Sequence, residues 1–354
     1  MSQPVVATLW YTRCQVPTPF SFAAQFGWFE EEFARDGIIV KSLKESTKVD
    51  ELASHFEHNL PNSFRQGGSV PAIWARARGQ DTRVIALTWT DEHQAIVALP
   101  GSGIRNAADL KGRRIGVPRH AITIDHNRAS AVRAFELVLD REGLSLADVE
   151  VIDLEDEGAD PANPRRGLTD PVGTRRHPYT NEARARAAGR VDAVYVKDVR
   201  GQDVAHILGA EVVVDVGNDP DPLIRVSNCA PRPLTVSGGL LEARPDLVDR
   251  FLGRVLDASL WAVANPDGAV RAIASETGWA EPAVRRAFGP HVHQHLGLTL
   301  DHDVVEPFDR FISYLAQRGF IAADVAAADW IDPGPLARVL AARGAAAPAL
   351  LATA

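Results

Sequence analysis

The chain has 354 residues, of which 45% are hydrophobic and 24% are charged, a composition typical of a soluble globular protein. Its formal net charge of -8 leaves no basic excess to neutralise phosphates, which argues against nucleic-acid binding. A single hydrophobic core stops growing at about 250–300 residues, so the length predicts two lobes.

The N-terminal third alternates predicted strands and helices. One continuous helix is expected over 20–37, where phenylalanines recur at helical spacing, and a Gly-Gly loop is expected at 67–68. The other helices are predicted at 49–58 and 70–78, and the strands at 4–11, 38–45, 82–90 and 94–100. This alternation predicts an α/β fold with largely parallel sheets.

A second unit is expected from Leu99 onward. It contains predicted strands at 113–117, 149–154 and 210–217, a helix over 126–144, a helix-strand pair at 181–196, and a long polar loop at 155–179. Loops of this length are usually functional. The chain then returns to the first lobe near residue 222. The predicted domains are therefore 1–98 plus 222–354 for lobe 1, and 99–221 for lobe 2.

The N-terminus carries no Lys or Arg in its first ten residues, and its apolar run is too short for a signal peptide. No later segment reaches the roughly 18 consecutive apolar residues of a membrane span. We therefore expect a cytoplasmic protein that is not embedded in a membrane. Its two cysteines, Cys14 and Cys229, are expected to be reduced thiols, and a single disulfide between them is the alternative.

Three segments resemble the type II periplasmic solute-binding superfamily: NAADLKGRRIGVP, RVDAVYV and ARPDLVDRF. The resemblance covers most of the chain. It implies two α/β lobes joined by two crossing segments, with a ligand cleft between the lobes. By itself it does not imply catalysis.

Three further segments are similar to the 2'-hydroxybiphenyl-2-sulfinate desulfinase family: YTRCQVP at 11–17, HFEHNLPNSFRQGG at 55–68 and LKGRRIGV at 110–117. The resemblance implies an active site with a cysteine in a Y-x-x-C-x-V-P loop, a histidine ten residues before an arginine, and a following Gly-Gly. In this chain these residues are Cys14, His55, Arg65, Gly67 and Gly68. The implied activity is hydrolysis of the carbon–sulfur bond of an aryl sulfinate, with release of sulfite and without a metal or an organic cofactor. The segment 119–180 departs from the family pattern, so the sequence does not define the aromatic part of the substrate.

Elementary chemistry assigns a role to each of these residues. Cys14 is predicted at a strand end just ahead of a helix, where helix amides and nearby cations lower a thiol pKa, although a buried structural cysteine is the alternative. Arg65 and the amides of Gly67 and Gly68 suit an anion such as a sulfinate. His55 would hydrogen-bond Cys14 or position water. Cys14 could attack the sulfur or donate a proton to the ipso carbon.

Other candidates are weaker. His58 is interpreted as a solvated or capping residue and Cys229 as a packed thiol. The residues that follow the strand at 113–117 or end the long loop belong either to polar loops or to a ligand site: His120, His126, Arg128, His177 and Tyr179. The HVHQH sequence at 291–295 lacks a carboxylate at ligand spacing, so no metal is expected there. Nucleotide-binding motifs are absent from the sequence.

Two other functions stay open at this point. A solute-binding protein for organic sulfonate- or sulfinate-type anions, of the kind that serves an ABC transporter, would use Arg65 and the Gly-Gly loop without catalysis. A lyase or decarboxylase on the same scaffold could hold a carboxylate in place of the sulfinate. In each case the expected partner is a small organic anion, and the expected state is a monomer.

Overall fold

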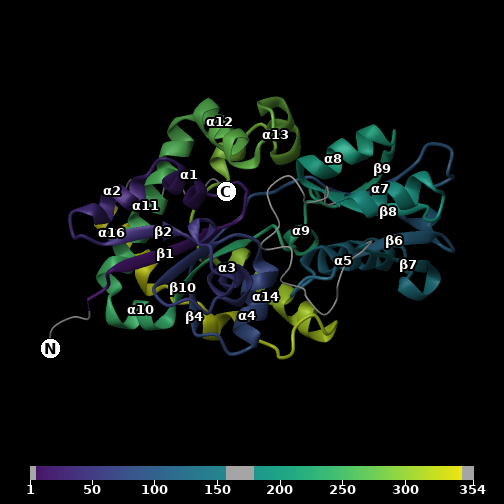
Figure 1. Ribbon diagram of the computed structural model, residues 1–354. Helices are drawn as coiled ribbons and strands as arrows, with labels where there is room; N and C mark the ends of the chain where they lie inside the picture. The colour runs from purple at the N-terminus through teal and green to yellow at the C-terminus, as the bar shows by residue number, and fades with distance from the viewer. Residues whose placement is uncertain (1–4, 157–178, 345–354) are drawn as a thin grey trace. The chain divides into compact units, whose positions relative to one another are not determined.

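The computed structural model describes residues 5–156 and 179–344 (Figure 1). The chain divides into two compact units. The first consists of Met1–Thr90, Cys229–Arg285 and Pro290–Ala354, and the second consists of Asp91–Asn228 and Arg286–Gly289. Most of the long loop that we predicted at 155–179 lies outside the described residues.

The first unit is built on a five-stranded sheet with the order β2-β1-β3-β10-β4. Strands β2 and β3 run parallel to β1, whereas β10 is antiparallel to both β3 and β4. The strands are β1 (Thr8–Arg13), β2 (Ile39–Ser42), β3 (Ser63–Gln66), β4 (Thr82–Thr88) and β10 (Arg232–Ser237).

Helices surround this sheet. They are α1 (Pro19–Gln25), α2 (Trp28–Ala34), α3 (Val49–Glu57), α4 (Ser69–Ala77), α10 (Gly238–Ala243), α11 (Pro245–Ala264), α12 (Pro266–Thr277), α14 (His302–Gln317), α15 (Ala327–Trp330) and α16 (Gly334–Arg343), with the 3-10 turns η1 (Leu43–Glu45) and η4 (Val292–Gln294). Helix α13 (Glu281–Phe288) crosses from the first unit into the second after Arg285. None of the described helices combines the length and the apolar character that a membrane span requires.

The register of β1 against β3 places one pair of aromatic residues and one pair of polar residues on opposite faces of this sheet. Tyr11 pairs with Phe64, and Thr12 pairs with Arg65. Because successive side chains of a strand point to opposite faces, each pair lies on its own face. Tyr11 and Phe64 join an aromatic core with Phe251, whose ring stacks on that of Phe64 at a centroid distance of 3.8 Å. Thr12 and Arg65 lie on the other face.

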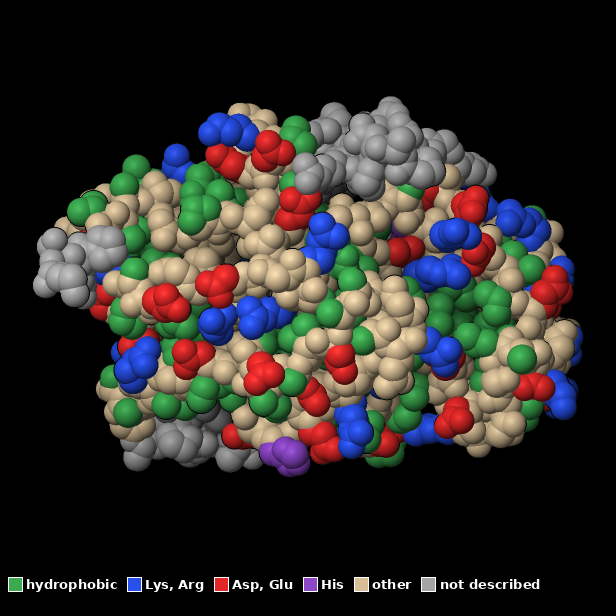
Figure 2. All heavy atoms as spheres, turned by 90° about the horizontal axis from the view of Figure 1, so that it is seen from below, with side chains coloured by type: hydrophobic (Ala, Val, Ile, Leu, Met, Phe, Trp, Pro, Cys, Tyr) green, Lys and Arg blue, Asp and Glu red, His purple; other side chains and the backbone are tan. Residues whose placement is uncertain are grey.

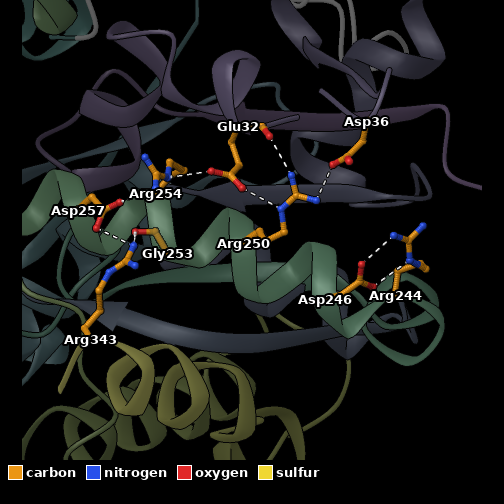
Figure 3. Close-up of polar contacts among 9 residues, drawn as sticks. All are labelled: Glu32, Asp36, Arg244, Asp246, Arg250, Gly253, Arg254, Asp257 and Arg343. Atoms are coloured by element: carbon orange, nitrogen blue, oxygen red, sulfur yellow. Dashed lines mark hydrogen bonds and ion pairs between the residues drawn. The ribbon is translucent and has the colours of Figure 1, made fainter. Parts of the chain in front are cut away.

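Ion pairs along α11 link this helix to the segment of α2 and to α16 (Figure 3). Arg250 donates to the carboxylates of Glu32 and Asp36 and to the carbonyl of Glu32. Arg343 of α16 pairs with Asp257 at 2.7 Å. These contacts fix helices of distant sequence against one another, while Phe251 holds α11 to the sheet.

The second unit repeats the strand arrangement of the first, with the order β7-β6-β8-β5-β9. Again two neighbouring pairs are parallel and two are antiparallel. Its strands are β5 (Gln94–Ala98), β6 (Arg114–Arg119), β7 (Glu150–Glu155), β8 (Ala193–Lys197) and β9 (Glu211–Asp215). Its helices are α5 (His126–Asp140), α7 (Thr180–Ala187), α8 (Asp198–Ile207) and α9 (Pro222–Arg225), with the 3-10 turns η2 (Ala107–Leu110) and η3 (Leu146–Asp148).

The structure confirms the predicted α/β class, but each sheet is mixed and not largely parallel, and three further details differ from the prediction. The helix expected over 20–37 is two helices, because Gly27 takes a left-handed φ of 72° and ends the run. Strand β3 was not predicted, since four residues give too short a pattern. Strand β5 belongs to the second sheet, so the first boundary lies at Thr90 and not at residue 98, and the second lies at Asn228 and not at residue 221.

Candidate active site

Cys14 directly follows strand β1 and lies beside the end of strand β3. Its backbone N–H donates to the carbonyl of Gln66 at 3.3 Å, which extends the pairing of the two strands by one step. Helix α1 begins five residues later at Pro19, with the Thr18 side chain accepting from the Ser21 N–H as a helix cap. The thiol therefore lies on a short loop that is fixed at both ends, and it is half-buried.

Gly67 provides the space that the sulfur occupies. A Cβ atom at this position would lie 2.4 Å from the sulfur of Cys14 and 3.1 Å from its Cβ. No side chain fits there without displacing the cysteine. The first glycine of the Gly-Gly pair is thus explained by a close approach of backbone and thiol.

His55 lies in the last turn of α3 and connects β1 to the thiol. Its Nδ1 is 2.7 Å from the hydroxyl of Thr12, and its Nε2 is 3.8 Å from the sulfur of Cys14. Because Thr12 holds one ring nitrogen, the other is directed at the sulfur. This fixed orientation is what a base or a thiolate partner requires.

Arg65 lies on β3 beside Thr12, with only 3% of its surface exposed. Its Nε donates to the carbonyl of His55 at 3.3 Å. Within residues 5–156 and 179–344, the two outer nitrogens of the guanidinium are buried without a hydrogen-bond partner. A buried, incompletely paired cation makes this part of the site electropositive.

The surroundings of Cys14 favour its ionised form. Burial opposes ionisation, but the hydrogen bond and charge of His55, the charge of Arg65 and a hydrogen bond from the Gly68 backbone outweigh it and lower the pKa of the thiol to about 6. Above this pH most of the thiol is a thiolate, which is the nucleophilic form.

The five predicted site residues therefore come together in the first unit. Strand β1 leads into Cys14, α3 carries His55, β3 carries Arg65, and the turn into α4 carries Gly67 and Gly68. The register of β1 and β3 and the position of α3 produce this convergence. Their catalytic roles stay predictions.

Most of the weaker candidates belong to the second unit or have structural partners. His120 is 2.9 Å from Asp156 and Arg128 pairs with Asp153, all in the second unit.

Cys229 is buried, and neither cysteine forms a disulfide. The Tyr179 hydroxyl donates to the Lys197 carbonyl. His177 lies outside the described residues. The HVHQH sequence spans η4, and no group of His, Cys, Asp or Glu in the described part of the chain could hold a metal ion.

Two neighbours of the site were missed or misjudged. Thr12 was not predicted, although its place two residues before Cys14 on a strand puts it on the polar face. His58 was expected to be solvated or capping. It does occupy the C-terminal cap of α3, but only 7% of its surface is exposed.

Comparisons with known proteins agree with this fold. A family model described as NMT1/THI5 like matches residues 16–162. The chain is 30% identical to the 2'-hydroxybiphenyl-2-sulfinate desulfinase of Rhodococcus erythropolis over 350 residues, which cover 92% of each protein. A crystal structure of a cysteine-to-serine mutant of the enzyme DSZB in complex with biphenyl-2-sulfinic acid matches with a TM-score of 0.75, 27% identity and coverage of 96% of this chain and 100% of that one.

A more distant match is the alkanesulfonate-binding protein SsuA of Xanthomonas axonopodis pv. citri bound to MOPS. It has a TM-score of 0.62 at 18% identity, with 94% of this chain and 99% of that one covered. The fold is thus that of the periplasmic-binding-protein-like α/β proteins. Within this class, the chain belongs to the 2'-hydroxybiphenyl-2-sulfinate desulfinase family.

Proposed function

We propose that this protein is a desulfinase that hydrolyses the carbon–sulfur bond of an aryl sulfinate and releases sulfite. The observation that carries the proposal is the convergence of a low-pKa thiol, an oriented imidazole and a buried guanidinium in a member of this family. The reaction balances with water alone, because an aryl sulfinate and one water give the arene and hydrogen sulfite. It consumes no oxidant, reductant or organic cofactor.

The sulfinate group would lie beside Cys14, near the backbone amides of Gly67 and Gly68 at the start of α4. Amides at a helix start favour an anion, and Arg65 adds a positive charge. Because the outer nitrogens of Arg65 are buried, substrate oxygens reach them only after the side chain or its cover moves. Without such a movement Arg65 acts through its field, by stabilising the thiolate and the bound anion.

Two routes are chemically balanced. In the first, the Cys14 thiolate attacks sulfur, the carbon–sulfur bond breaks and the aryl carbon takes a proton from solvent, which is returned when the thiol formed in the next step ionises again. Water, assisted by His55, then cleaves the sulfur–sulfur bond of the adduct to give hydrogen sulfite and the thiol. In the second, the Cys14 thiol protonates the ipso carbon, sulfur dioxide leaves, and its hydration gives hydrogen sulfite and returns a proton to the thiolate. The lowered pKa of Cys14 favours the first route.

The test is sulfite release from a panel of aryl sulfinates by the wild-type protein, Cys14→Ser and the matched control Cys229→Ser. We expect the wild type and the control to release sulfite, and Cys14→Ser to lose at least about 1,000-fold in kcat, as for removal of a nucleophile. The absence of sulfite from every wild-type reaction would contradict the proposal.

Binding without turnover is the alternative, favoured by the shared fold with the alkanesulfonate-binding protein. Calorimetry separates the two functions. Tight sulfinate or sulfonate binding that persists in Cys14→Ser, with no sulfite released by the wild type, would identify a solute-binding protein.

We also propose a cytoplasmic monomer that takes a small aromatic sulfinate and binds neither nucleic acid nor membrane. On the face drawn in Figure 2, acidic and basic side chains are interspersed, as expected for a surface without a nucleic-acid patch. Cell fractionation and size-exclusion chromatography test the location and the monomeric state.

A further inference from the structure

Arg65 is a buried cation whose hydrogen bonds are incomplete. Its Nε reaches the His55 carbonyl, whereas its two outer nitrogens have no partner among the described residues. A buried hydrogen-bonding group that is left unpaired destabilises the fold, and a charged group does so more strongly. The guanidinium is therefore held in one position only if a further group accepts hydrogen bonds from these two nitrogens.

His58 is the second incompletely paired group in this region. It lies at the C-terminal cap of α3, where its backbone N–H donates to the backbone carbonyl of Ser54, and its φ of 51° is unusual for a residue with a side chain. Neither ring nitrogen has a partner among the described residues. Burial and the charges of Arg65 and His55 lower the pKa of His58 well below its usual value. The ring is therefore neutral at neutral pH, with one nitrogen able to accept a hydrogen bond.

Both side chains line one small cavity in the first unit. Its volume is about 10 Å³, which is roughly the space of one water molecule and far too small for an aryl sulfinate. Hydroxyl groups also line it, from Thr12, Ser54 and Thr235. A small cavity with polar walls holds water when two or more groups can bond to it.

We propose that His58 is a positioning residue for Arg65, and that one water in this cavity accepts from the guanidinium and donates to the neutral imidazole. This arrangement completes the hydrogen bonds of Arg65 and keeps its charge near Cys14. The inference deepens the proposed function, since Arg65 acts there, but its test follows the acidity of Cys14 and needs no turnover.

The experiment measures the rate at which iodoacetamide alkylates Cys14 in the full-length protein as a function of pH, by mass spectrometry of the Cys14 peptide. The groups that surround the sulfur are His55 on α3, Arg65 on β3 and the Gly68 amide before α4. The variants are His58→Phe, which fills the cavity and removes the acceptor, and His58→Gln, which keeps an acceptor. His302→Phe is the control, because that side chain is 82% exposed.

We expect a midpoint near pH 6 for the wild type and the control. In His58→Phe the midpoint should rise by about one pH unit, since a misplaced Arg65 no longer favours the thiolate, and His58→Gln should restore most of the shift. An unchanged midpoint in a folded His58→Phe, with a normal melting temperature, would overturn the proposal.

A crystal structure of the wild type provides a measurement that does not depend on the folding of a variant. We expect a water within hydrogen-bond distance of both Arg65 and His58. A dry cavity, or a His58 ring that bonds only to protein groups, would contradict the inference.

Discussion

The reactivity of the site depends on a few interatomic distances around one sulfur atom. Thr12 orients His55, His55 and Arg65 favour the thiolate, and Gly67 leaves room for it. Each of these contacts can be changed separately, so each makes its own prediction.

The first prediction concerns pH. Because the pKa of Cys14 is lowered to about 6, we expect kcat/KM for an aryl sulfinate to rise with pH through about 6 and then to level off, as for a thiolate nucleophile. A profile that instead falls above this pH would favour the proton-donor route. The contribution of Cys14 to the stability of the fold also increases with pH. A depressed pKa stabilises the fold fully above the unfolded value of about 8.5, and this contribution is lost as the pH falls through the folded value.

A Gly67→Ala substitution tests the close approach of backbone and sulfur. The added methyl group would lie 2.4 Å from the sulfur, so Cys14 must move. We expect a loss of about 100-fold in kcat, which is typical of a displacement of about 1 Å at a reacting group. The matched control is Gly239→Ala in α10, where nothing lies within 4 Å of the added atom. Equal activities of the two variants would show that the contact does not matter.

A Thr12→Val substitution tests the orientation of His55. Valine has the shape of threonine but cannot hydrogen-bond Nδ1, which lies 2.7 Å from the hydroxyl. Loss of one such bond corresponds to about a tenfold drop in kcat/KM. Thr12→Ser keeps the hydroxyl and should retain activity near that of the wild type. If both variants behave alike, the hydroxyl has no orienting role.

The core residues of the site were predictable, but their supporting residues were not. Cys14, His55, Arg65 and the Gly-Gly pair have a recognisable spacing in the sequence. Thr12 and His58 matter because of the register of β1 and the burial of the end of α3, and both depend on contacts between distant segments. Local sequence carries little information about such contacts.

At the scale of elements, short strands and apolar helix faces determine where the site residues lie. Strand β3 has four residues and places Arg65 beside Thr12. Helix α11 fixes the opposite face of the same sheet, since Phe251 stacks on Phe29 and Phe64 at 3.9 and 3.8 Å. Gly27, which separates α1 from α2, is a residue at which a helix break is recognisable in the sequence.

The energetic contrast along α11 gives a fourth prediction. Phe251 is fully buried, so Phe251→Ala should lower the free energy of unfolding by about 3–5 kcal/mol in urea denaturation. Arg254→Ala removes ion pairs to Glu32 and Asp257 from a side chain that is 34% exposed, and should cost at most about 1 kcal/mol. A larger cost for the arginine would mean that the ion pairs in Figure 3 dominate the stability of this helix.

At the scale of the whole molecule, the two units contain five-stranded sheets with the same pattern of parallel and antiparallel neighbours. In each sheet the fourth strand in the order, β10 or β5, is antiparallel to both its neighbours. The α/β class followed from the alternation of elements, and the return of the chain to the first unit was predicted within a few residues of its place at Cys229. The sequence did not predict which sheet contains β5. Two consecutive apolar strands have the same sequence pattern whether they pair with each other or belong to different sheets. All five predicted site residues lie in the first unit.

The most direct test of the account is a count of turnovers. The wild-type protein, incubated with an aryl sulfinate and a metal chelator, should release sulfite and desulfinated arene in equal amounts and in many equivalents per chain. Cys14→Ser, folded and at the same concentration, should release neither. Equal release by both proteins, or none by the wild type with any aryl sulfinate tested, would contradict the central claim that the Cys14 thiolate performs this reaction.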